Sequence, residues 1–176
     1  LLKWQWGASM KFIHSNYGQY RSSAIAMDLA VLYYDTLKKM QASFVLKNMG
    51  TQIKKYAGSR ADDLPFDVQL GITKRLANLP LQFSATAHHL HRFDILYNDT
   101  AFNNQNGLGS NLSKSFTIDK LFRHFVFSAQ FFISDKLELS AGYHHLRRKE
   151  LSITNSPNGL TGFSYGLGVL LKKIQI

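Results

Sequence analysis

The strongest constraint in this sequence is a two-residue alternation of apolar and polar side chains that returns eight times. In the first copy, from Leu2 to Phe12, the even positions are apolar and include Trp4 and Trp6, while the odd positions hold Lys, Gln, Gly or Ser. Side chains of a β-strand point alternately to two faces, so this period predicts strands with one apolar face. The other copies cover residues 24–33, 40–47, 66–73, 81–88, 124–131, 137–144 and 162–169.

The lengths of the strands and of the links between them favour a membrane barrel. We expect strands of roughly 9 to 12 residues, which is longer than usual in a soluble sheet and suits a tilted crossing of a bilayer. Long and short links alternate, as the external loops and periplasmic turns of outer-membrane barrels do. The long links are 13–22, 48–65, 91–120 and 146–159, and the short ones are 35–39, 76–79, 134–136 and 171–173.

The polar face has the composition of a confined lumen. It holds mostly Gly, Ala, Ser, Thr and Gln, with isolated charges such as Asp28 and Glu138. A sheet facing bulk water would carry more long charged side chains. Rings near strand ends suit the headgroup region of a membrane. These aromatic residues are Trp4, Trp6, Tyr33, Tyr34, Phe66, Phe122 and Phe163.

The sequence therefore predicts an all-β protein, an antiparallel up-and-down transmembrane β-barrel of the outer membrane. We expect residues 1–176 to form a single domain with about eight strands. The chain starts at Leu1, and a new alternation begins at its last residues, 172–176, so we also expect it to be an internal portion of a longer chain. The alternative fold is a soluble all-β sandwich or a lipocalin-like barrel that binds lipid.

Composition excludes several other classes. The apolar content of 45% and the presence of only 3 Pro exclude a disordered chain, and the absence of Cys excludes disulfide frameworks and cysteine-ligated metals. No apolar stretch approaches the roughly 18 residues of a membrane-spanning helix. No cofactor is expected.

A hydrolase motif occurs once. Residues 162–166 read G-x-S-x-G, which in serine hydrolases places the serine on a sharp turn from strand to helix. Here the alternation runs on without a break, so we expect Ser164 to be one small residue on the polar face of a strand. We therefore predict no catalytic residue and no enzyme activity.

Six of the seven histidines lie in three short stretches near strand ends. If the strands pair in sequence order, His88, His124 and His144 share the lumen face at the ends with long links. Three neutral imidazoles could bind a divalent metal such as zinc, with Asp94 or Glu150 as an oxygen ligand. We favour a network of hydrogen bonds at the rim instead, because these spacings on strands impose no coordination geometry.

The formal net charge is +10, and 10 of the 21 Lys and Arg residues lie in the long links. On the outer rim of a barrel, such residues favour anionic lipid, lipopolysaccharide phosphate or a partner protein. Solvated loops are the alternative, and no motif accompanies the charge that would indicate nucleic acid. The rim residues are Arg21, Lys54, Lys55, Arg60, Arg92, Arg147, Arg148 and Lys149.

Several stretches resemble the PorQ-type proteins of the Bacteroidota type IX secretion system, which are related to PorV and to fatty-acid-transporter-like barrels. The more specific ones are H-H-L-H-R at residues 88–92 and F-R-H at residues 122–124. The likeness also includes residues 7–12, 46–52, 64–66, 83–87 and 162–168.

The resemblance implies an outer-membrane barrel of the cell-surface attachment complex, which tethers a partner protein and helps to link secreted cargo to lipopolysaccharide. It also implies a larger barrel of roughly fourteen strands, of which this chain would be a part. A transporter or channel for a hydrophobic or small solute is the second functional hypothesis.

Overall fold

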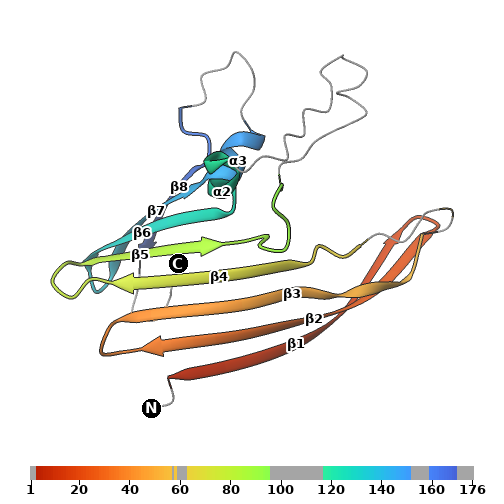
Figure 1. Cartoon of the computed structure of the whole chain (residues 1–176), viewed down its shortest axis with the longest axis horizontal. Helices are drawn as coiled ribbons and strands as arrows, with labels where there is room; N and C mark the ends of the chain where they lie inside the picture. Colours follow the sequence, from red (N-terminus) through yellow and green to blue (C-terminus); the bar gives the residue numbers. More distant parts are fainter. Residues whose placement is uncertain (1–2, 57, 59–62, 96–116, 152–158, 170–176) are drawn as a thin grey trace.

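The protein forms one curled antiparallel β-sheet (Figure 1). The computed structural model describes residues 3–56, 58, 63–95, 117–151 and 159–169. Its eight strands are hydrogen-bonded in sequence order, each antiparallel to the next. The predicted all-β, up-and-down fold is therefore confirmed. Among the described strands the sheet is not closed, because β1 and β8 form its two edges.

The strands have different lengths. They are β1 (Trp4–Tyr17), β2 (Tyr20–Asp35), β3 (Met40–Lys54), β4 (Asp67–Arg75), β5 (Leu81–Ala87), β6 (Phe125–Ser134), β7 (Leu137–His144) and β8 (Phe163–Val169). The short helices are α2 (Ile118–Arg123) and α3 (His145–Glu150). We call the end with the β2–β3, β4–β5 and β6–β7 turns the short-turn end, and the opposite end the long-link end.

One face of the sheet is apolar across all eight strands. Paired residues on neighbouring strands share a face, and the ladder joins Leu29 of β2 to Leu46 of β3 and then to Val68 of β4. The register continues apolar rows to β8. Large side chains exposed on this outer face are those of Trp4, Trp6, Met10, Phe12, Ile25, Met27, Leu29, Val31, Phe44, Leu70, Ile72, Phe83, Phe127, Phe131, Leu139, Phe163, Tyr165 and Leu167.

The part of the chain that the structure describes has almost no apolar core. Its buried apolar residues are Ala24, Ala26, Ala87 and Leu146. On β2 the small residues of the polar face are covered, while Ile25 and its apolar neighbours are exposed. A water-soluble domain of this size buries its large apolar side chains instead. The large apolar side chains of the outer face are therefore left exposed in the described part of the chain.

The first three strands run further than the alternation predicted. The expected long link 13–22 is wrong, because β1 and β2 continue into a tight hairpin whose connection is only Gly18 and Gln19. Gly18 has a φ of 58°, which a glycine adopts without steric cost. Beyond Ile13 the regular alternation ends, although the strands do not. Exposed side chains there include Tyr17, Tyr20 and Ile53 as well as polar ones.

We call residues 13–25 and 49–56, where the first three strands run beyond the predicted pattern, the extension. A β-bulge in β3 lies just before it. The ladder shifts between Met27 and Leu29, and Asn48 of β3 has a φ of 57°. The Asn48 backbone N–H donates to Asp28 Oδ1 at 2.8 Å, and Lys11 Nζ lies 2.5 Å from Asp28 Oδ2. These contacts satisfy the carboxylate of the isolated polar-face acid, and bulges of this kind increase the local twist.

Two of the long links contain helices that the sequence analysis did not predict. Helix α2 lies in the link 91–120 and its continuation, and α3 replaces the start of the link 146–159. Each has six residues and packs at the long-link end of β6–β8 (Figure 1). Within the described ranges, no helix is both long and apolar enough to cross a membrane. The short link 171–173 lies outside the described residues.

Candidate functional site

A histidine-lined pocket opens on the polar face at the long-link end. Its volume is about 640 Å³, and strands β4, β5, β6 and β7 contribute to it together with α3. We call it the histidine pocket. It is lined by Asp67, Gln69, Thr86, His88, His89, Val126, His144, Leu146, Arg147, Glu150 and Leu151.

His88 is the most unusual member of the pocket. It is only 7% exposed, and its backbone N–H donates to the carbonyl of His124 at 2.9 Å. Its Nδ1 lies 2.5 Å from Nδ1 of His89, so one of the two rings donates to the other. Its Nε2 is buried and has no hydrogen-bond partner among the residues that the structure describes. A buried polar atom without a partner is costly, and it is a frequent mark of a site that a ligand or water completes.

The predicted histidine trio comes together only in part. The rings of His88 and His144 lie 5.1 Å apart, but His124 does not line the pocket. His124 follows α2, and its Nδ1 and Nε2 face the backbone carbonyls of His88 and Phe93 at 2.8 Å and 3.2 Å. Its two nitrogens are therefore engaged, as in a network of hydrogen bonds. His144 caps α3, because its Nδ1 accepts from the Arg147 N–H.

The predicted oxygen ligands also separate. Asp94 pairs with Lys120 at 3.1 Å and with Arg123 at 3.6 Å, whereas Glu150 lines the histidine pocket. Among the residues described, no group of three or more His, Asp or Glu side chains is placed to hold a metal ion. Ser164 is the second residue of β8 and pairs with Gly142, so it lies on a strand rather than on a turn into a helix.

An acidic centre that the sequence analysis missed joins the two helices. Asp119 of α2 accepts from Arg123 at 2.6 Å and from His145 at 2.9 Å, and Lys149 lies 3.0 Å away. Burial acts to raise the pKa of Asp119, but the hydrogen bonds from these three side chains outweigh it, so the pKa lies well below its usual range. The i,i+4 spacing of Asp119 and Arg123 was the available sequence signal.

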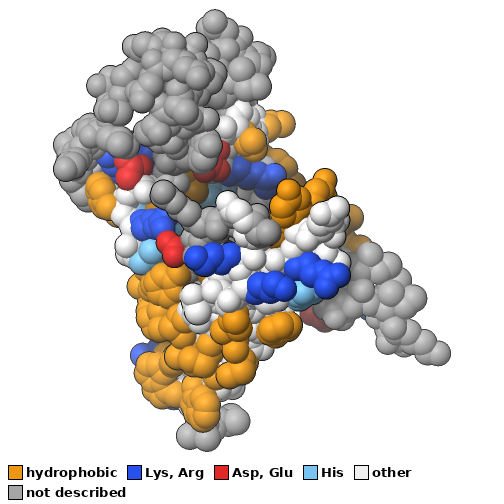
Figure 2. All heavy atoms as spheres, turned by 90° about the vertical axis from the view of Figure 1, so that its right-hand side faces the viewer, with side chains coloured by type: hydrophobic (Ala, Val, Ile, Leu, Met, Phe, Trp, Pro, Cys, Tyr) orange, Lys and Arg blue, Asp and Glu red, His pale blue; other side chains and the backbone are white. Residues whose placement is uncertain are grey.

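The predicted rim residues lie around the long-link end. Arg21 and Lys54 are on the extension of β2 and β3, while Arg147 and Arg148 are exposed on α3. Figure 2 looks at the molecule from the side of the extension and shows Lys and Arg gathered in a band, apart from the main hydrophobic area. Lys55 and Arg92 are also exposed at this end, Lys149 is bound to Asp119, and Arg60 lies outside the described residues.

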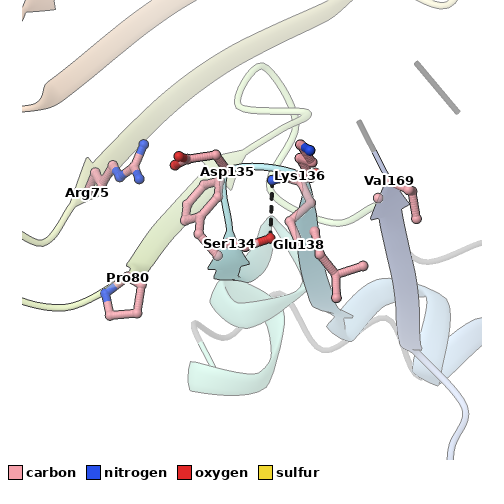
Figure 3. Close-up of a pocket in the computed structure, with 10 residues that line it drawn as sticks. Arg75, Pro80, Ser134, Asp135, Lys136, Glu138 and Val169 are labelled. Carbon is pink, nitrogen blue, oxygen red and sulfur yellow. Dashed lines mark hydrogen bonds between the residues drawn. The ribbon is translucent and has the colours of Figure 1, made fainter. Parts of the chain in front are cut away.

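A second pocket lies at the short-turn end, with a volume of about 430 Å³. The Arg75 guanidinium sits 4.2 Å from the centre of the Phe132 ring, a cation–π contact. Figure 3 shows Arg75 and Asp135 on one side of the pocket and Val169 of β8 on the other. Glu138 also lines it, so the pocket mixes both charge signs with apolar surface.

Because His88 is buried in the histidine pocket, we predict that the free energy of unfolding decreases in acid. Burial first, and then the charges of the nearby His89 and His144, lower the pKa of His88 to about 4, against the opposing charge of Asp67. The unfolded chain, with an ordinary histidine pKa of 6.5, then binds the proton more readily. Stability is therefore full above about pH 6.5 and falls as the pH drops toward 4.

We expect the thermal unfolding midpoint in detergent micelles to fall between pH 7 and pH 4.5, and the His88→Gln variant to lose much of this fall. His14→Gln is the matched control, since His14 is exposed on β1. Equal pH profiles for wild type and His88→Gln would contradict the assignment.

Comparisons with protein-family models, curated proteins and solved structures found no match for this chain.

Proposed function

We propose that this chain forms part of a non-enzymatic outer-membrane β-barrel that acts as a scaffold in type IX secretion, where it tethers a partner protein of the cell-surface attachment complex. The membrane part of the proposal rests on one observation. Large apolar side chains are exposed across a whole face of eight strands, while the described residues bury mainly alanines. Such a face far exceeds the apolar patches of soluble monomers and fits contact with lipid.

The height of the apolar face agrees with a bilayer. On β1 the outer face is apolar from Trp4 to Phe12, and on β2 from Ile25 to Tyr33. Nine residues extend about 30 Å along a strand, which is about 23 Å of height at a tilt of about 40°. The lipid-facing band of outer-membrane barrels is about 25 Å tall.

Support for the scaffold part comes from the resemblance to PorQ-type proteins and from the long-link end. There α2 and α3 are joined through Asp119, and Arg147 and Arg148 are exposed beside them. A fixed helical platform with exposed cations is suited to hold an anionic partner surface.

Deletion of the gene in the source bacterium tests the scaffold role. We expect type IX cargo to leave the cell surface and appear in the medium, and the wild-type gene to restore its attachment. A tagged copy should also co-purify with attachment-complex proteins from detergent-solubilised outer membranes. Cargo that stays attached to deletion cells would contradict the proposal.

A transporter or channel is the second candidate, and the polar face favours it in one respect. Gly71, Gly142 and Gly166 line this face, so its wall carries little side-chain bulk. A steady open conductance of the intact protein in planar bilayers would favour this reading. Its absence, together with co-purified attachment proteins, would favour the scaffold.

A further inference from the structure

The outer face changes character abruptly where β1–β3 leave the apolar band. Up to Phe12 and Ile25, the paired residues whose side chains point to the outer face are apolar. The next outward pair is His14 and Ser23, and the register places Lys54 of β3 beside Ser23. One step further out, Asn16 pairs with Arg21. On β1 and β2 this face therefore passes from apolar side chains to basic and polar ones within two residues. On β3, Thr51 lies beside Ile25, and the exposed Ile53 directly precedes Lys54.

The charge of this extension is of one sign. Residues 13–25 and 49–56 contain Arg21, Lys54 and Lys55 but no Asp or Glu. Arg21 and Lys54 are exposed, and among the residues described neither has an acidic partner. Since the nearest acid on β2, Asp28, is on the polar face and paired with Lys11, it does not neutralise them.

We infer that this row, formed by His14, Arg21 and Lys54, binds the phosphate of an outer-leaflet phosphorylated lipid of the lipid A class. The inference rests on the proposed membrane location. The acyl chains lie against the apolar rows below, which include Phe12 and Ile25. The basic row begins two strand residues further out, which is about 7 Å along the strand and about 5 Å of height at a tilt of about 40°. An amphiphile with this arrangement meets both parts of the surface at once.

The row has hydrogen-bond donors as well as charge. Arg21 can bind phosphate with two parallel N–H groups, and Lys54 adds a compact cation. His14 Nδ1 lies 2.9 Å from Ser23 Oγ, so these two side chains orient each other next to the cations. A phosphate attached to a lipid is held in place by its acyl chains, whereas free phosphate has only the charge.

The test uses the full chain folded in detergent micelles and native mass spectrometry to count bound lipid. The probe is diphosphoryl lipid A, compared with lipid A from which the phosphates have been removed. We expect Arg21→Gln combined with Lys54→Gln to weaken binding of the diphosphoryl form about tenfold or more, since each cation makes charge-assisted hydrogen bonds. The matched control is Lys38→Gln with Lys136→Gln, two exposed lysines at the short-turn end, and it should bind like wild type.

Two further arms make the result decisive. Inorganic pyrophosphate at the same concentration should not displace the lipid. Raising the salt concentration from 0.05 to 0.5 M should weaken the binding of diphosphoryl lipid A to the wild-type protein, a test that requires no variant. Equal binding of both lipid A forms, or equal loss in both double variants, would overturn the inference. If the apolar face contacts lipid but phosphate makes no difference, only this inference fails, whereas loss of lipid contact altogether would reject the membrane proposal.

Discussion

The Leu29→Arg substitution is expected to destabilise the protein in a bilayer by about 2–4 kcal/mol. Leu29 lies at the middle of the apolar band of β2, between Ile25 and Tyr33. An Arg at the lipid-facing midplane of a barrel costs this amount, because its charge must leave water. The free energy of unfolding is measured by denaturant titration of protein refolded into vesicles.

The matched control is Ala30→Arg, one residue further on the same strand. Ala30 faces the opposite side of the sheet and pairs with Gly7. A Cβ added to Gly7 would meet no atom within 4 Å, so there is open space beside Ala30. The polar face therefore has room for the longer side chain, and we expect a cost below about 1 kcal/mol. If both variants lose the same stability, or if Leu29→Arg loses none, the outer face does not contact lipid.

Gly50→Ala is expected to destabilise the β2–β3 pairing by about 1–3 kcal/mol, through overpacking against backbone. A Cβ on Gly50 would overlap the backbone oxygen of Ile25 and lie 2.6 Å from Ala26 Cα. Backbone atoms cannot turn aside as a flexible side chain can, so β2 must shift. Because Gly50 follows the bulge, the shift should loosen the extension of β1–β3.

Gly7→Ala provides the comparison for this prediction. A Cβ there meets open space, and alanine in a strand is favoured over glycine by about 0.5–1 kcal/mol. Hydrogen exchange should show faster exchange of the amides in residues 13–25 for Gly50→Ala and unchanged or slower exchange for Gly7→Ala. Unchanged amide exchange in residues 13–25 of Gly50→Ala would contradict the close approach of Gly50 to the β2 backbone.

The sheet could be predicted from the sequence because one face of each strand is apolar and the other is polar. In each of the eight strands, such as β2 with Leu29, every second residue is therefore apolar, and this two-residue period is visible in the sequence. The order of strands followed from the links, since antiparallel neighbours need only short connections. The position of Ser164 on a strand also followed, because the alternation continues on both sides of it.

The extension and the site could not be predicted in the same way. Beyond Ile13 the strands are held by backbone pairing and by side-chain hydrogen bonds such as that of Gln52 to Ser22, so no apolar pattern marks them. Helices α2 and α3 are short, and what fixes them is tertiary, above all the bonds of Asp119 to residues of both. His124 has the parity of a lumen residue but follows α2, so its ring turns to backbone carbonyls rather than into the histidine pocket.

Quenching of tryptophan fluorescence by brominated lipid tests the central claim most directly. The chain has only two tryptophans, Trp4 and Trp6, which lie on the outer face of β1 and are 64% and 84% exposed. In vesicles of brominated phosphatidylcholine we predict blue-shifted emission, most of which is quenched relative to vesicles without bromine. Emission typical of water, with the same intensity in both kinds of vesicle, would contradict the account.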